Sequence, residues 1–154
     1  MYISAILRPA AVRTMHSLSS KKRLFHDLGD IAATVYGLPL DATIEALMER
    51  ETLGPTGVGQ GIALPHARLK DLNTVVGVFM RIEKPLDFNS VDRQPVDLVF
   101  GLFAPANSGV DHLKALALVA RTLRNPLICS KLRSNEDPAT LHAVLTEGPT
   151  SVAA

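Results

Sequence analysis

Two long apolar runs constrain the fold of this 154-residue chain more than any other feature. Residues 75–80 read VVGVFM, and residues 96–103 read VDLVFGLF. Apolar residues occupy adjacent as well as alternate positions, which is typical of strands in a sheet that is covered on both faces. One acidic residue, Asp97, interrupts the second run, and we expect it to make a structural ion pair or hydrogen bond. The sequence therefore predicts a buried sheet between helices.

Two helices are predicted in the first third of the chain. The spacing of apolar residues between positions 24 and 36 predicts an amphipathic helix, with a serine at 19 or 20 as its cap and Gly37 as its end. A second helix is predicted to begin at an Asp41 N-cap and to run to Leu53. Glu51 falls on the apolar face of its last turn. Either fraying at the helix end or a neighbouring polar site would explain that position.

The last third of the chain is predicted to be helical. A helix is expected over residues 109–124, and Ser108 and Asp111 have the spacing of a capping box at its start. Its predicted core stripe consists of Leu113, Leu116, Ala117, Ala120 and Leu123. Shorter helices are expected near 127–133 and 138–146. The sum is a single α/β domain over residues 1–154, in which a mixed β-sheet is covered by helices on both faces.

Bulk properties exclude several classes of function. The formal net charge is only +1, so no strong field attracts nucleic acid or an anionic membrane. The one cysteine, Cys129, excludes an internal disulfide and a CxxC zinc site, and we expect it to be a half-buried small apolar residue. No run approaches the roughly 18 apolar residues of a membrane span, and the N-terminal run lacks a basic leader. We expect a cytoplasmic protein without membrane insertion, bound metal or cofactor.

A glycine-rich run is the most unusual local feature. Residues 54–61 read GPTGVGQG, which predicts irregular backbone, and a short predicted strand, Ile62–Leu64, leads from it to Pro65 and His66. A Rossmann fingerprint would need a third glycine at position 62, and a Walker A loop would need a following Gly-Lys-Ser/Thr. The run alone fits a tight turn as well as an anion-binding loop.

The neighbours of this run indicate phosphohistidine chemistry. Arg50 precedes it and His66 follows it. A histidine with an unperturbed pKa near about 6.5 is often neutral, and so nucleophilic, at neutral pH. Amides and a cation would stabilise the anionic phosphoryl group, and Pro65 would help to aim His66. The candidate phosphate-binding residues of the loop are Thr56, Gly57, Gly59 and Gly61.

Residues 50–68, RETLGPTGVGQGIALPHAR, resemble the enzyme IIA domains of the bacterial phosphotransferase system. The class is the fructose/mannitol one, and the nearest likeness is to its nitrogen-regulatory type. The family signature is an Arg-Glu pair, Gly-x-Thr-Gly, a glycine-spaced loop and a strand that ends in Pro-His. The resemblance continues at 75–79, 94–105, 111–116 and 128–133, and so spans nearly the whole chain. Pro55 and Ala67 depart from the signature, and Pro55 removes one loop amide.

The resemblance implies a role for three residues. His66 would carry a phosphoryl group received from a small histidine-phosphorylated, HPr-like carrier protein, Arg50 would be the site arginine, and His112 the second site histidine. Spacing alone favours a partly buried structural histidine at 112, near a helix N-terminus that disfavours the imidazolium form. The remaining histidines have no supporting pattern and are taken as surface or packing residues: His16, His26 and His142.

Three functions remain open. The leading hypothesis is a phosphotransferase component of the nitrogen-type branch, in which phosphorylation regulates binding to other proteins. The resemblance implies that these include potassium transport or sensor proteins. The alternative is a sugar-specific enzyme IIA that passes phosphate to a membrane sugar transporter. A third reading is a binding module that keeps the fold without transfer, against which the intact His66 and Arg50 argue.

Overall fold

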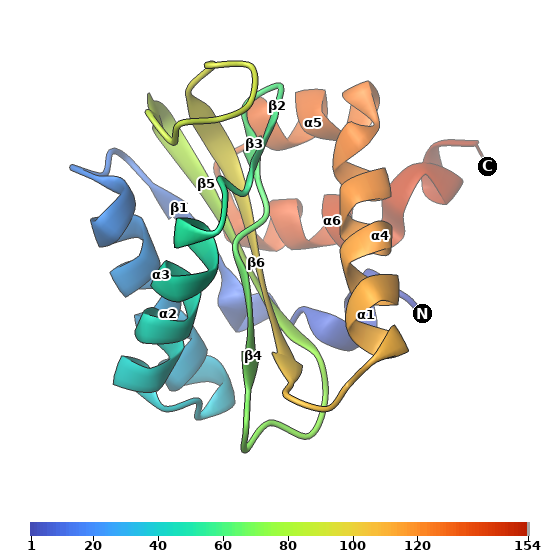
Figure 1. Cartoon of the computed structure of the whole chain (residues 1–154). Coiled ribbons are helices and arrows are strands. Elements are labelled where there is room, and N and C mark those ends of the chain that lie inside the picture. Colours follow the sequence, from blue (N-terminus) through green and yellow to red (C-terminus); the bar gives the residue numbers. More distant parts are fainter. Residues whose placement is uncertain (154) are drawn as a thin grey trace.

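A six-stranded mixed sheet lies between two helical layers in the computed structural model, which describes residues 1–153 and the side chains of residues 1–147 (Figure 1). One face is covered by α2 (Lys21–Tyr36) and α3 (Leu40–Thr52). The other face is covered by α4 (Val110–Arg124), α5 (Pro126–Arg133) and α6 (Pro138–Ala153). A short α1 (Ile3–Ile6) and a 3₁₀ turn (Pro9–Ala11) come first in the chain. The predicted fold class is confirmed.

The sheet is built around its most buried strand, β6 (Val96–Pro105). The strand order is β1-β5-β6-β3-β2, and β4 also pairs with β6. The other strands are β1 (Val12–Met15), β2 (Gly57–Gly59), β3 (Ile62–Ala63), β4 (His66–Leu69) and β5 (Val76–Leu86). The two apolar runs of the sequence are β5 and β6, which pair antiparallel and form the centre of the core. β1 was not predicted, because four residues are too few for a clear pattern.

β3 and β4 act as one strand that is interrupted at Leu64 and Pro65. Both run parallel to β6, β3 opposite Leu98 and Val99 and β4 opposite residues 102–105. Proline has no amide hydrogen with which to continue the ladder, although its carbonyl still accepts a hydrogen bond from the Leu102 amide at 2.9 Å. Because His66 is the first residue after the interruption, the break in the strand sets where its side chain lies.

The caps of the first two long helices agree only in part with the prediction. The Ser20 hydroxyl accepts a hydrogen bond from the Arg23 amide, and Gly37 ends α2 in the left-handed region at φ 72°, as predicted. α3 begins one residue before the expected cap, with Pro39 at the N-cap. Asp41 is therefore not the N-cap but lies in the first turn, where the positive end of the helix dipole favours its carboxylate.

One prediction about α4 is wrong and another is correct only in part. The capping box is absent, because Gly109 is the N-cap and no side chain caps the helix. The core stripe is correct at Leu123, which is buried, and at Leu116 and Ala120, which pack against the core, but Leu113 is 64% exposed and Ala117 is exposed. The residues that face the core are His112, Ala115, Val119, Thr122 and Leu123. Ala115 and Val119 are buried in the middle of α4, where the expected stripe placed Leu116 and Ala117.

Two expectations about single side chains can be compared with the structure. Asp97 forms the predicted ion pair, with its carboxylate 2.9 Å from Arg133 Nε. Cys129 is more deeply buried than expected, and its thiol donates a hydrogen bond to the Leu123 carbonyl at 3.0 Å. In the part of the chain that the structure describes, no helix combines the length and apolarity needed to cross a bilayer.

Candidate active site

His66 lies in an open pocket between α3 and α4. α3 contributes the residues of its last two turns, and α4 contributes those of its first two. The lining residues are Ala46, Glu49, Arg50, Leu53, His66, Ala67, Arg68, His112, Leu113 and Leu116. The pocket therefore brings together His66, Arg50 and His112, which lie far apart in the sequence.

The hydrogen bonds of His66 define which ring nitrogen is free to react. Nδ1 lies 2.9 Å from the Leu64 carbonyl oxygen, and Nε2 lies 3.2 Å from Arg50 Nε. A carbonyl can only accept and a guanidinium can only donate, so the matching tautomer carries its hydrogen on Nδ1. Nε2 then holds the lone pair and is the nucleophilic atom of the pocket.

His66 is held in its neutral form by its surroundings. Burial is the largest effect and lowers the pKa of His66 below the ordinary value of 6.5. The hydrogen bond to the Leu64 carbonyl opposes this shift, and the charge of Arg50 lowers the pKa further. The ring is therefore neutral at neutral pH, with its Nε2 lone pair available, as a nucleophile requires.

His112 faces His66 from the first turn of α4. The ring centroids are 5.4 Å apart and the ring planes meet at 68°. His112 is only 5% exposed, and its Nε2 is buried without a hydrogen-bond partner among the described residues. Burial, followed by the charges of His66 and Arg68, lowers the pKa of His112 to about 4, so this ring is also neutral at pH 7.

Arg50 and Glu51, in the last turn of α3, point in different directions, and only Arg50 contacts His66. Arg50 also donates from Nη1 to the Gly54 carbonyl at 3.1 Å, which holds the guanidinium beside His66. The Glu51 carboxylate is buried and points away, 2.6 Å from Lys21 Nζ and 3.0 Å from the Thr56 amide. Fraying is therefore the wrong explanation for Glu51, which ties α2 and the following loop to α3.

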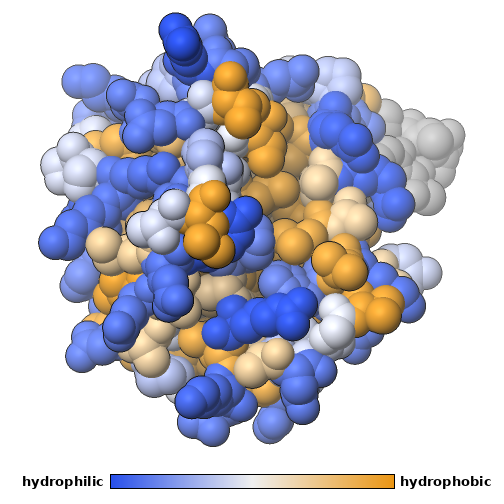
Figure 2. All heavy atoms as spheres, viewed as in Figure 1, coloured by the Kyte–Doolittle hydropathy of each residue, from blue (hydrophilic) through white to orange (hydrophobic). Residues whose placement is uncertain are grey.

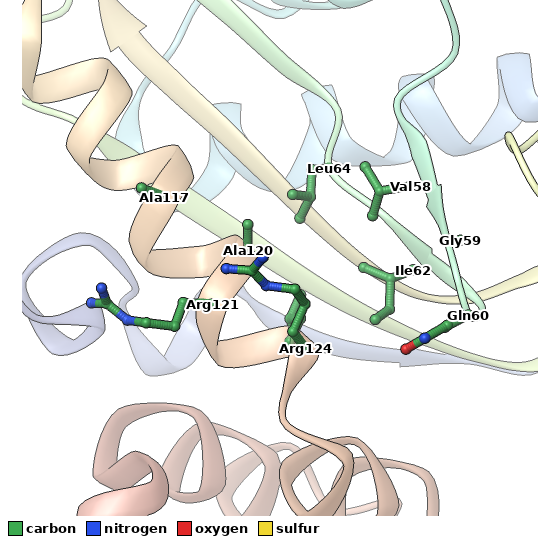
Figure 3. A pocket seen from close by; sticks show the side chains of 10 residues that line it. Val58, Gly59, Gln60, Ile62, Leu64, Ala117, Ala120, Arg121 and Arg124 are labelled. Atoms are coloured by element: carbon green, nitrogen blue, oxygen red, sulfur yellow. The ribbon is translucent and has the colours of Figure 1, made fainter.

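The glycine run does not line the His66 pocket. Thr56 uses both its amide and its hydroxyl on Glu51, and Gly57 pairs with Ala63 in a short β2–β3 hairpin. The expectation of wholly irregular backbone is therefore wrong in the middle of the run, where residues 57–59 form β2. Gly59 lines a separate apolar groove between the hairpin and α4, together with Leu64 and Ala120 (Figure 3).

Gly61 lies at the far end of the hairpin. Its φ of 80° is left-handed, and a Cβ there would lie 2.6 Å from Arg133 and 2.8 Å from Asp97. The nearby Asp97–Arg133 ion pair therefore accounts for a glycine at this position. None of the four predicted loop residues, Thr56, Gly57, Gly59 and Gly61, is a lining residue of the pocket that holds His66.

Arg68 is a pocket residue that was not predicted from the sequence. It follows His66 by two positions in β4, so both side chains lie on the same face of the strand. Its Nε donates to His112 Nδ1 at 3.1 Å. The alternation of a short strand after Pro65 was the available signal, because it placed Arg68 beside His66.

The remaining histidines lie outside this pocket. His16 pairs with Glu83 at 3.0 Å on the surface, and His142 Nε2 lies 3.0 Å from the Leu7 carbonyl. His26, Asp27 and Asp30 place their ligand atoms within 4.8 Å of one another on α2, an arrangement that could hold a metal ion. Asp27 is already paired with Arg23 at 3.2 Å, and nothing links this group to His66.

Comparison with known proteins places this geometry in a family. Residues 5–148 match the family model described as phosphoenolpyruvate-dependent sugar phosphotransferase system, EIIA 2. The nitrogen regulatory protein of Bradyrhizobium diazoefficiens is 43% identical over 153 residues, which cover 99% of this chain and 100% of that protein. The nitrogen regulatory protein of Escherichia coli strain K12 is 38% identical over 148 residues, 96% of this chain and 91% of that one.

A solved structure agrees with both relatives. The crystal structure of the nitrogen regulatory protein IIA-Ntr from Neisseria meningitidis has a TM-score of 0.86 and 34% identity, over 94% of this chain and 99% of that one. The match of sequence and fold extends over nearly all residues, including both sides of the His66 pocket. The chain belongs to the EIIA 2 family of the phosphoenolpyruvate-dependent phosphotransferase system, a family of phosphotransfer proteins.

Proposed function

We propose that His66 accepts a phosphoryl group on Nε2 from a histidine-phosphorylated, HPr-like carrier protein, and that the phosphorylated state selects regulatory partners. One observation carries the proposal: a neutral His66 presents its Nε2 lone pair in an open pocket, beside Arg50 Nε at 3.2 Å and opposite the buried Nε2 of His112. The names of the relatives support the nitrogen-regulatory branch. We place the exchange in the cytoplasm.

The transfer step requires little rearrangement of His66. The Nε2 lone pair attacks phosphorus, a new N–P bond forms, and the N–P bond of the donor breaks with its electron pair returning to the donor ring. His66 keeps its proton on Nδ1, so its ring gains positive charge as the new bond forms. The Leu64 carbonyl, 2.9 Å from Nδ1, stabilises that charge.

Arg50 and His112 would stabilise the anionic group as it arrives. In the unphosphorylated protein the Arg50 Nε–H group donates a hydrogen bond to the Nε2 lone pair of His66. This bond must break before Nε2 reacts, and Arg50 can then donate to the phosphoryl oxygens. Its second bond, to the Gly54 carbonyl, keeps the guanidinium near the site meanwhile. His112 offers a second donor from the opposite wall. Phosphoryl transfer depends on such positioning and charge rather than on covalent help.

The rim of the pocket is suited to a protein partner. Leu53, Leu113 and Val110 are among the exposed large apolar residues, and the first two line the pocket. The space-filling view shows apolar residues gathered among charged ones on this face (Figure 2). A phosphoryl group adds about two negative charges to this rim, which changes the partners that fit it. We propose that potassium transport or sensor proteins distinguish the two states.

The proposal is tested by incubation with a histidine-phosphorylated, HPr-like carrier, followed by a search for acid-labile phosphate on the protein. Pull-downs from lysate with the phosphorylated and unphosphorylated protein would then compare the partners. Absence of any labelling would favour a binding module without transfer. Rapid onward transfer to a membrane sugar transporter would favour the sugar-specific enzyme IIA.

The variant His112→Ala should accept phosphate about tenfold to a hundredfold more slowly and yet remain labelled. It loses one donor to the phosphoryl oxygens but keeps the nucleophile and Arg50. Initial rates of labelling by the phosphorylated carrier measure the effect. His142→Ala is the matched control, because His142 is a half-buried histidine outside the pocket. Complete loss of labelling in His112→Ala would show that the roles of the two histidines are assigned wrongly.

The rate of labelling should be constant from about pH 8 to pH 7 and fall only at a pH below the ordinary histidine pKa of about 6.5. The pKa of His66 is lowered, so the lone pair is lost only when the pH falls to that lowered value. His112 does not titrate in this range, because its pKa is about 4. Initial rates at fixed donor concentration test this dependence. A rate that rises as the pH falls from 7 to about 5.5 would contradict the neutral nucleophile.

A further inference from the structure

We infer that Arg68 is a positioning residue, which fixes the tautomer of His112 so that its Nε2–H group is directed at the phosphoryl site. The consequence for transfer rests on the proposed function. The tautomer itself does not, since it is a property of the unphosphorylated protein.

The contact between Arg68 and His112 has only one consistent arrangement of hydrogens. Arg68 Nε lies 3.1 Å from His112 Nδ1, and a guanidinium nitrogen has no lone pair to offer. Nδ1 must therefore be unprotonated, and the single hydrogen of the neutral ring must lie on Nε2. A weaker bond from Arg68 Nη1 to the Ala106 carbonyl, at 3.5 Å, links the same guanidinium to the segment that precedes α4.

The buried Nε2–H group of His112 lacks a hydrogen-bond acceptor among the described residues, and a ligand that accepts from it would remove this unfavourable free energy. The residue is only 5% exposed. An unpaired buried donor is unfavourable, so this group is suited to an acceptor that arrives from outside. The His66 ring lies next to it, with its centroid 5.4 Å away. An oxygen of a phosphoryl group on His66 is the acceptor that we infer.

A His112 ring protonated at Nδ1 could not donate a hydrogen bond to the phosphoryl group. A lone pair on His112 Nε2 would face the phosphoryl oxygens, and two acceptors repel one another. Arg68 prevents that arrangement from two directions. Its Nε–H bond disfavours a hydrogen on Nδ1, and its positive charge contributes to the lowered pKa that keeps the ring neutral. β4 thus supplies both the nucleophile, His66, and the residue that orients His112, which is Arg68.

The tautomer can be measured without any phosphoryl donor. ¹⁵N-histidine labelling and long-range ¹H–¹⁵N correlation at neutral pH should show His112 protonated at Nε2 in the wild type. In Arg68→Met the Nδ1–H form should become populated and the ring should titrate at higher pH. Arg68→Lys should retain much of the wild-type signal. Arg121→Met is the matched control, an exposed arginine on α4 that lines the hairpin groove and not the His66 pocket (Figure 3).

The second measurement is the rate of labelling by the phosphorylated carrier. We expect Arg68→Met to be slower by about tenfold and Arg68→Lys to lie between it and the wild type. Thermal unfolding and unchanged His66 signals establish that the variants are folded. A wild-type His112 protonated at Nδ1, or a tautomer unaffected in Arg68→Met, would overturn the inference. If the wild type accepted no phosphate, the proposed function would fail, while the tautomer would still decide the role of Arg68.

Discussion

His66→Gln is expected to accept no phosphoryl group from a histidine-phosphorylated carrier at any donor concentration. Glutamine fills much of the same space and can still accept a hydrogen bond from Arg50, but its amide nitrogen has no available lone pair. The neighbouring histidine cannot replace the nucleophile, because the Nε2 of His112 is buried and carries the hydrogen. Labelling with a radioactive phosphoryl donor, stopped under alkaline conditions that preserve phosphohistidine, measures the loss.

The matched control for this variant is His142→Gln, which changes a histidine that lies outside the pocket. It should label at the wild-type rate, and both variants should unfold at similar temperatures. Labelling of His66→Gln to an extent comparable with the wild type would mean that another residue is the acceptor. The pocket would then be a binding surface only.

Glu51→Ala is expected to lower the free energy of unfolding by about 3 kcal/mol. The Glu51 side chain is only 8% exposed and lies 2.6 Å from Lys21 Nζ, which is itself 22% exposed. Removing one partner of a buried ion pair leaves the other charge uncompensated. The Thr56 amide and hydroxyl lose their acceptors at the same time. The loss is large because one carboxylate joins α2, α3 and the start of β2.

Urea denaturation at neutral pH measures this effect. Glu45→Ala is the control, since Glu45 is an exposed residue of the same helix, and its effect should stay within about 0.5 kcal/mol. A loss below about 1 kcal/mol in Glu51→Ala would show that Lys21 and Thr56 find other partners. Because Arg50 precedes Glu51 in the same turn, we also expect slower labelling of Glu51→Ala.

The layers of the fold could be predicted because hydrophobic periodicity is a local signal. β5 and β6 are apolar on both faces, and α2 carries both its cap and its terminal glycine in the sequence. α4 shows where this reasoning fails. Leu123 is buried as predicted, but Leu113 is exposed, and Ala115 and Val119 face the core in place of the residues expected there. That packing depends on the distance between two elements, which no local pattern contains.

The candidate site was predictable to a different degree at each residue. His66 and Arg50 flank an unusual segment, so chemistry and resemblance both singled them out. The glycines of that segment were predicted to bind phosphate, and at one of them, Gly61, a Cβ would contact the Asp97–Arg133 ion pair. A glycine indicates a close approach but not what approaches. Arg68 was missed because its partner, His112, lies 44 positions away.

The position of the N–P bond is the most direct test of the central claim, that His66 reacts through an unprotonated Nε2. Protein labelled with ¹⁵N-histidine is phosphorylated by the carrier, and the coupling between ³¹P and ¹⁵N identifies the bonded nitrogen. The structure predicts a single phosphoryl group on Nε2 of His66, with the hydrogen retained on Nδ1 beside the Leu64 carbonyl. A phosphoryl group on Nδ1 of His66, or on any other residue, would contradict it.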